Sequence, residues 1–330
     1  MPPVIRRLAD RVGGLVRRPR VARTAAQIFE FSGALTLADR VDRGLSGGDI
    51  TAVPLPPAAT ALRVHRIKMY RHQGRDQIAR AIHDGGWRGF ERPLPDIFCL
   101  LVRELGAGVV YDVGANTGFY GLVAVTAHRH VEVHAFEPAR QIIPLMERNV
   151  ALSLYRNRIS INRKGVSDQS GIATLYVPLT SGLVETSSSL EREFKDEHQE
   201  SYQVPVTTID QHWLQTGCPR VTVIKIDVEG HEMPALRGAG ELVSKARPVL
   251  VVEVLVGAPM ADLQAFVSAH HLVDLWVSPT EVVVGDIVRF HPLAWNHVLV
   301  PREKVDDLLV PLKKLELVVT DLREKTDLSE

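Results

Sequence analysis

The sequence predicts an α/β fold, built on a mostly parallel sheet with helices on both faces. Three observations support this class: runs of valine and isoleucine recur from residue 109 onward, amphipathic stretches lie between them, and a glycine-rich turn follows the first run. Runs without polar alternation indicate strands buried on both faces. The intervening helices supply the crossovers that parallel strands need.

Ahead of the sheet, residues 1–75 predict a helical extension. Within it, 1–44 carry an apolar stripe opposite arginines, and 44–60 form a linker rich in glycine and proline. A second helical passage covers 74–105. Strands are expected at 109–114, 131–138, 159–167, 171–178, 221–230 and 247–256, and helices at 118–129, 139–154 (despite Pro144) and 233–246.

These elements predict a core domain over 76–300, followed by a helical tail over 301–330. Four leucines of the tail stand at helical spacing: Leu308, Leu309, Leu312 and Leu315. They predict a helix that docks on its own domain or forms a homodimer together with the amino-terminal helix.

Composition and charge argue against several classes of protein. The chain carries 39 basic and 39 acidic side chains, so no global field attracts it to nucleic acid or to an acidic membrane. No apolar run approaches the roughly 18–20 residues that span a bilayer, and the amino terminus lacks the apolar core of a secretory signal. The two cysteines, Cys99 and Cys218, make no disulfide framework, and Cys99 is expected in the core. A cytoplasmic protein is expected.

The glycine-rich turn lies at the end of the first strand, in the order "DVGANTG". A strand, a glycine turn and a helix bring backbone close to a ligand at the carboxyl edge of a sheet. The dinucleotide fingerprint would place its third glycine where Phe119 stands, so a pyrophosphate would lose its close backbone approach. The spacing is instead similar to the loop of S-adenosylmethionine (SAM) methyltransferases. That resemblance implies these donor contacts: Asp112, Gly114, Asn116, Thr117 and Gly118.

An acid ends the next strand, in "AFEP". Glu137 lies 19 residues beyond Gly118, near the interval of about 20 at which an acid binds the ribose hydroxyls of a nucleoside cofactor. Enzymes that use NAD share this device. Glu137 therefore predicts a nucleoside cofactor without choosing between SAM and NAD.

Five blocks appear in order along the chain: "YDVGANTGFYGLVA", "AFEPARQIIPLMERNVALS", "GVSDQSGIATLYVP", "VPVTTID" and "IKIDVEGHEMPALRGA". Together they resemble the FkbM-type SAM-dependent methyltransferases over about residues 80–255. The resemblance implies a Rossmann-like class I methyltransferase fold, SAM as methyl donor and O-methylation of natural products, sugars and glycans. On this basis the expected acceptor is a saccharide or a glycosylated small molecule, selected by the flanking regions 1–75 and 265–330.

The block "KIDVEGHE" places three candidate catalytic residues at the carboxyl end of a parallel strand, the edge where α/β sheets bind ligands. We expect His231 as general base, because its ordinary pKa of ~6.5 lets it accept a proton at working pH. Glu229 is its partner or alternate, and Asp227 positions the donor or the acceptor. Glu232 is expected in the first turn of the following helix. Lys225 is expected to pair with a carboxylate or to extend outward.

Other site residues and functions remain open at this point. Asp227, Glu229 and Glu253 offer the oxygen ligands that Mg²⁺ prefers, so a divalent ion is an alternative. Acceptor contacts are predicted for Trp87, Arg88, Ser188 (one of three serines, 187–189, that resemble the "SSL" element of the family) and Glu253. The alternatives are an oxidoreductase that uses a nicotinamide cofactor, a nucleic-acid methyltransferase, and a SAM-binding module without catalysis.

Overall fold

A computed structural model describes residues 49–55, 66–178, 187–194, 198–292 and 294–323, without the side chains of Arg88, His198 and Gln199. The chain forms two compact units, Met1–Phe90 and Glu91–Glu330. The predicted helix within 1–44 lies outside the described residues. In the described part of the chain, no helix is both long enough and apolar enough to cross a bilayer.

The first unit contains a pair of antiparallel strands, β1 (Ile50–Pro54) and β2 (Arg66–Tyr70). The prediction that 1–75 is helical, with a loop over 44–60, is therefore wrong for these segments. The reason is a period of two: every second side chain is buried in both strands, including Val53 in β1 and Ile67 in β2. Helix α4 (Gln77–Gly85) and the 3₁₀ turn η1 (Gly86–Gly89) follow.

The second unit is built on a sheet that joins nine of the described strands, in the order β14-β12-β11-β13-β10-β9-β3-β4-β5. Strands β10 to β5 in this order are parallel neighbours, whereas β13 lies antiparallel between β10 and β11. The predicted α/β class is confirmed. The strands are β3 (Gly108–Val113), β4 (Val131–Phe136), β5 (Ile159–Asn162), β9 (Val221–Ile226), β10 (Val249–Glu253), β11 (Leu272–Val277), β12 (Glu281–Gly285), β13 (Asn296–Pro301) and β14 (Val318–Asp321).

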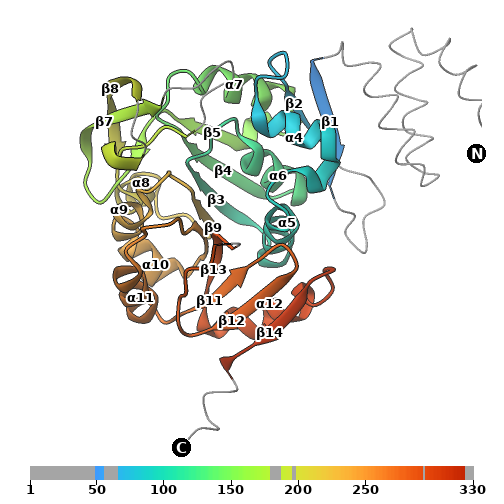
Figure 1. The fold of residues 1–330 in the computed structure, drawn as a ribbon, viewed down its shortest axis with the longest axis vertical. Helices are drawn as coiled ribbons and strands as arrows, with labels where there is room; N and C mark the ends of the chain where they lie inside the picture. The colour runs from blue at the N-terminus through green and yellow to red at the C-terminus, as the bar shows by residue number, and fades with distance from the viewer. Residues whose placement is uncertain (1–48, 56–65, 179–186, 195–197, 293, 324–330) are drawn as a thin grey trace, which may run out of the picture. The chain divides into compact units, whose positions relative to one another are not determined.

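Helices cover both faces of this sheet (Figure 1). One face carries α5 (Leu94–Leu105), α6 (Phe119–Ala127) and α12 (Val305–Leu312), and the other carries α8 (Ile209–Gln215), α9 (Glu232–Arg237), α10 (Gly240–Ala246) and α11 (Met260–Ala269). Helix α7 (Ile143–Leu152) follows β4 and begins one residue before Pro144, where a proline is tolerated. A small sheet of order β6-β8-β7 lies beside the main one and contains β6 (Gly165–Val166), β7 (Gly171–Pro178) and β8 (His198–Thr207).

Two predicted helices differ in extent. The helix expected over 233–246 is divided into α9 and α10 at Gly238, where an added Cβ would lie 2.2 Å from the Ser167 carbonyl oxygen. Of the helical tail expected over 301–330, the structure describes residues 301–323, and within these only α12 and the short 3₁₀ turn η4 (Arg302–Lys304) that precedes it are helical. Residues 318–321 instead form β14, which pairs with the open edge of β12. Leu308, Leu309 and Leu312 are buried, and α12 packs on α5, so the helix docks within its own unit.

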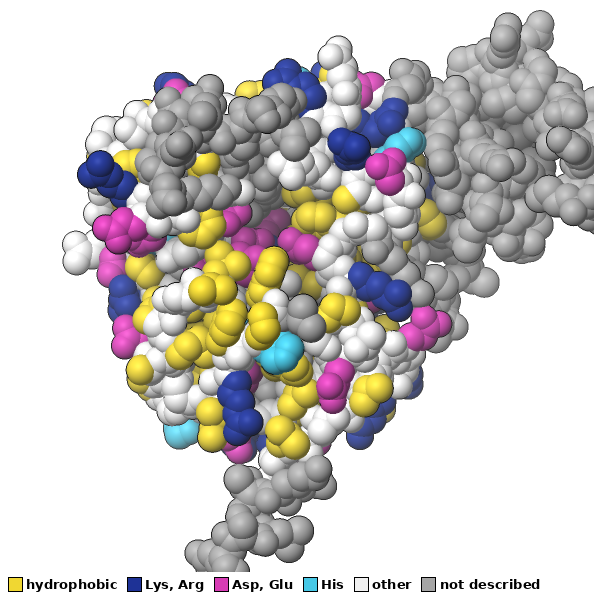
Figure 2. Space-filling model, viewed as in Figure 1, with side chains coloured by type: hydrophobic (Ala, Val, Ile, Leu, Met, Phe, Trp, Pro, Cys, Tyr) yellow, Lys and Arg dark blue, Asp and Glu magenta, His cyan; other side chains and the backbone are white. Residues whose placement is uncertain are grey.

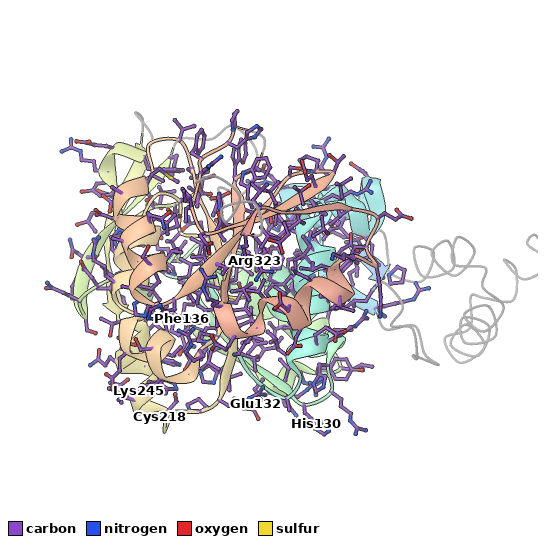
Figure 3. All side chains as sticks on the ribbon, turned by 90° about the horizontal axis from the view of Figure 1, so that it is seen from below. His130, Glu132, Phe136, Cys218, Lys245 and Arg323 are labelled. Atoms are coloured by element: carbon purple, nitrogen blue, oxygen red, sulfur yellow. The ribbon has the colours of Figure 1, made fainter. Side chains whose placement is uncertain are left out.

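Figure 3 shows the molecule from below the view of Figure 1, with the amino edge of the sheet along the lower border of the picture. His130, Cys218 and Lys245 precede β4, β9 and β10 and lie at the border of the molecule, whereas Phe136, at the far end of β4, is fully buried. Cys99 is buried and Cys218 exposed, and both are free thiols. The polar clusters described next lie at the opposite, carboxyl edge.

Candidate active site

The predicted site residues converge on the carboxyl edge of four neighbouring strands. β10, β9, β3 and β4 are adjacent in the sheet. Glu253 ends β10, Asp227 and Glu137 directly follow β9 and β4, and Asp112 is the penultimate residue of β3. Figure 2 shows acidic side chains near the centre of this face, over the region where β3 and β9 end, with hydrophobic side chains beside them. This is the edge at which parallel α/β sheets bind ligands.

The turn between β3 and α6 presses against the end of β9. Gly114 has φ +76°, and a Cβ at this position would lie 1.7 Å from the Asp227 carbonyl oxygen. Gly118 has φ +89° and directly precedes α6, but its Cβ would meet only the flexible Met146 side chain, at 3.1 Å. A glycine is therefore required at position 114 because the backbone of Asp227 lies close to it. The predicted close approach of this turn to a ligand remains a prediction.

Glu137 joins this turn to the one after β4. The Asn116 amide donates to Glu137 Oε2 at 2.9 Å, and the Ala139 amide donates to Oε1 at 2.8 Å. Burial raises the pKa of Glu137 to about 7, against the lowering effect of these two amides. Each carboxylate oxygen keeps a second lone pair, which is what the predicted contact with ribose hydroxyls needs.

A buried lysine lies at the centre of the acids. Lys225 is 3% exposed and stands on β9 opposite Asp112 of β3. Its Nζ lies 2.6 Å from Asp227 Oδ2 and 4.6 Å from the ring centroid of Tyr120, whose hydroxyl donates to Glu91 Oε2 at 2.6 Å. Burial lowers the pKa of Lys225, but the nearby Asp227, Glu91 and Asp112 outweigh burial and raise it overall. Of the two orientations predicted for Lys225, pairing with a carboxylate is the one observed.

The turn after β9 holds Glu229 in a left-handed conformation, with φ +55°, which is uncommon outside glycine. Glu232, in the first turn of α9 as predicted, accepts the Val228 and Gly230 amides at 3.1 Å each through Oε1. Burial raises the pKa of Glu232 to about 7, partly offset by the amides that it accepts. Glu232 thus ties this turn to the start of its own helix.

His231 is enclosed by protein groups. Its side chain is about one-tenth exposed, Nδ1 lies 2.6 Å from Glu191 Oε1, and Nε2 lies 3.0 Å from Ser167 Oγ. Both ring nitrogens therefore have partners within the chain. This arrangement leaves neither nitrogen open to an acceptor hydroxyl, and the predicted role of His231 as general base has no geometric support in it.

Glu253 ends β10 beside the same cluster. Burial, with Asp227 and Glu229 nearby, raises the pKa of Glu253 to about 10, against the opposing charge of Lys225. At neutral pH Glu253 is therefore a neutral acid that can donate a hydrogen bond. Among the described residues, no group of three or more His, Cys, Asp or Glu side chains is arranged to hold a metal ion. The three acids named as magnesium ligands do not form such a group.

The predicted acceptor residues divide between the two units. Trp87 and Arg88 belong to the first unit, whereas Ser188 lies in the second and accepts a hydrogen bond from Gln141 Nε2 at 3.1 Å. Sequence reasoning missed Glu91 and Glu191. Each lies in a different segment from the residue that it contacts, and neither stands in a motif, so no local spacing pointed to them.

A known protein family matches the part of the chain that contains this site. The family model of the methyltransferase FkbM domain matches residues 112–276, half of the chain. The chain belongs to this family. Its sheet is that of the class I α/β methyltransferase fold. The matched region contains every predicted donor and catalytic residue, whereas Trp87, Arg88 and Glu91 precede it.

Individual known proteins resemble the chain only in part. The 31-O-demethyl-FK506 methyltransferase FkbM of Streptomyces tacrolimicus is 40% identical over 72 residues, which are 21% of this chain and 26% of that protein. The chain thus spans about a quarter of that relative. The crystal structure of an FkbM methyltransferase from Methylobacillus flagellatus matches with 17% identity and a TM-score of 0.41, over 58% of this chain and 43% of the other. A SAM-dependent O-methyltransferase of Thermotoga maritima matches with 11% identity and a TM-score of 0.37, over 63% and 64% of the two chains.

The polar groups around the glycine turn fit the methyl donor that the FkbM family implies. Asp112 Oδ2 accepts the Gly121 amide at 2.9 Å, whereas Asp112 Oδ1 and Thr117 Oγ1 are buried without a hydrogen-bond partner. Burial raises the pKa of Asp112 to about 6, against the opposing charge of Lys225. Buried polar atoms are nearly always paired in native proteins. These two atoms therefore fit a ligand that brings donors, as the ammonium and hydroxyl groups of SAM do.

Proposed function

We propose that this protein transfers a methyl group from SAM to a hydroxyl group, as a SAM-dependent O-methyltransferase. The observation that carries the proposal is the meeting of the glycine turn, Glu137 and the Asp227–Glu229 turn at one edge of an FkbM-family sheet. The donor would be held by Asp112, Thr117 and the 114–118 turn at its methionine end. Glu137 would hold its ribose.

SAM supplies an electrophilic methyl group on a positively charged sulfur. The residues of this chain have to hold the oxygen of the acceptor hydroxyl in line with that methyl group, and they have to take up the proton that this hydroxyl loses. We assign the proton to a carboxylate of Glu229, the acid that the strained turn presents beside Asp227. Asp227, paired with Lys225, would position the reacting groups, and the neutral Glu253 would donate a hydrogen bond to the acceptor. His231 is not retained as the base, because both of its ring nitrogens are engaged.

A saccharide, or a glycosylated lipid or natural product, is the acceptor class we propose. The support is the family resemblance and the zero net charge, which does not favour nucleic acid. A magnesium requirement is not part of the proposal, because the described acids do not gather into a metal-binding group.

Two measurements test the proposed function. Calorimetric titration should show binding of SAM and S-adenosylhomocysteine and no binding of NAD. Incubation with SAM and a panel of glycans should add the mass of one methyl group to a hydroxyl-bearing acceptor. Binding of NAD without binding of SAM would contradict the proposal and indicate an oxidoreductase. Binding of SAM, with no acceptor methylated among hydroxyls, amines and carboxylates, would favour a SAM-binding module without catalysis.

Within an active enzyme, Glu229→Gln tests the assignment of the base. Turnover should fall roughly 10²- to 10⁴-fold, the contribution of a general base, with SAM affinity nearly unchanged. Glu193→Gln is the matched control, because Glu193 is an exposed acid of the same unit. Full activity of Glu229→Gln would exclude the glutamate as base.

A further inference from the structure

One short segment contacts three elements of the second unit. Residues 187–191, between β7 and β8, pair with β7 through Ser189, whose amide and carbonyl each exchange a hydrogen bond with Tyr176, at 3.0 and 2.8 Å. We call residues 187–191 the strap. Its side chains extend from this anchor toward two different turns at the carboxyl edge of the main sheet.

On one side the strap reaches the turn that follows Glu137. Ser188 Oγ accepts from Gln141 Nε2 at 3.1 Å, and Gln141 Oε1 accepts the Tyr202 hydroxyl at 2.9 Å. The same hydroxyl accepts the Arg140 amide at 3.0 Å. These bonds connect the strap and β8 to the turn that carries the predicted ribose acid.

On the other side the strap reaches the turn after β9. Ser189 Oγ donates to the Glu229 carbonyl oxygen at 2.6 Å, and the Glu191 amide donates to Ser189 Oγ at 3.0 Å. The Glu191 carboxylate lies 2.6 Å from His231 Nδ1. The strap therefore contacts both the backbone of Glu229 and the residue at the start of α9.

These contacts fall on a strained conformation. A residue other than glycine at φ +55° costs free energy and persists only where its surroundings fix it. Here the turn is fixed from α9 by Glu232 and from the strap by Ser189. Phe194 lies against Gly230, where an added Cβ would be 3.1 Å from its ring. The turn that presents Glu229 is thus held from both sides.

We propose that Ser189, Glu191 and His231 are positioning residues, which act through the turn that presents Glu229. In this role the imidazole of His231 is a rigid link between Glu191 and Ser167 and exchanges no proton with the acceptor. Through Ser188, the same strap connects the donor side of the site to its acceptor side. The inference rests on the proposed function only for its activity measurements.

The first test uses no activity. Hydrogen–deuterium exchange should become faster at the amides of 228–230 in Ser189→Ala and in Glu191→Gln, and remain as in the wild type in the control Glu193→Gln. The SAM dissociation constant should change by less than about threefold, because the glycine turn is not altered. Exchange at 228–230 equal to that of the control in both variants would overturn the inference, whether or not the protein methylates anything.

The second test separates a positioning histidine from a base. Glu191→Gln and His231→Asn should each lower turnover roughly tenfold or more, as misplacement of reacting groups does. The double variant should lose no more than the worse single variant, because the two side chains act as one unit. If His231→Asn loses turnover while Glu191→Gln stays active, His231 is the general base and the positioning role is refuted. Absence of methyl transfer in the wild type would refute the proposed function and leave the exchange result intact.

Discussion

Replacing Gly114 with alanine should be far more damaging than replacing Gly118, although both glycines belong to the same turn and both have positive φ. Each alanine brings left-handed strain of about 1–2 kcal/mol, offset by about 0.4–1 kcal/mol from a less flexible unfolded chain. At Gly118 only Met146 has to move, so the net loss should be about 1 kcal/mol.

At Gly114 the new methyl group meets backbone. The Asp227 carbonyl oxygen would have to retreat from 1.7 Å to at least 3.0 Å. That movement would also disturb the hydrogen bond from the Asp227 amide to the Val113 carbonyl, now 3.0 Å. Overpacking typically costs 1–3 kcal/mol and a lost hydrogen bond about 1 kcal/mol. The total loss should be about 3–5 kcal/mol.

Urea denaturation of Gly114→Ala, Gly118→Ala and the wild type measures this difference, with SAM titration at a temperature where all three are folded. The Gly114 variant should have a much lower midpoint and weaker SAM binding, because Asp227 moves. Equal midpoints for the two variants would refute the reasoning. The ends of β3 and β9 would then not approach each other as closely as described.

Three further predictions concern ionisable groups. Glu137→Gln should weaken SAM binding by about 1.5–3 kcal/mol, and unchanged affinity in calorimetry would place the ribose contact elsewhere. The raised pKa values of Asp112 (about 6) and Glu137 (about 7) mean that a cationic ligand should displace protons. The affinity for SAM should therefore rise between about pH 6 and pH 8, and binding should release protons. The affinity for S-adenosylhomocysteine, which lacks the sulfonium charge, should rise less over the same range. An equal pH dependence for the two ligands would contradict the placement of the SAM cation near these carboxyl groups. The Glu232 carboxyl, with its pKa raised to about 7, stabilises the fold fully below its ordinary pKa of 4.5, and this contribution is lost as the pH rises through 7. In urea denaturation, Glu232→Gln should therefore gain stability relative to the wild type between pH 5 and 8, and a constant difference would show that Glu232 does not titrate in this range.

The strands and helices of the core were predictable because their signals are local. Buried parallel strands such as β3 and β9 consist mainly of valine and isoleucine, and the acid near the end of each was visible in the sequence. Strand β14 was not predictable in the same way. Its residues follow a leucine pattern of helical spacing, and what makes them a strand is an edge of β12 formed by residues 281–284.

The predicted catalytic residues show the same limit. The sequence placed Asp227, Glu229 and His231 correctly at one edge, but not the direction in which each is held. His231 is turned by Glu191, forty positions earlier in the chain, and Gly114 is required by the Asp227 backbone on another strand. Such requirements arise only after the strands have assembled, so no spacing within a motif contains them.

Strand β14 should also affect whether the protein associates with other chains. Its four residues occupy the outer side of β12, a valine-rich strand in which Val282 and Val284 are fully buried. A chain shortened to end before residue 318 would present the bare amides and carbonyls of β12 to any passing strand, and such edges recruit other chains. Solubility in this protein should therefore depend on a segment remote from the chemistry. A protein shortened at its carboxyl terminus for crystallisation should therefore keep all residues up to and including Asp321.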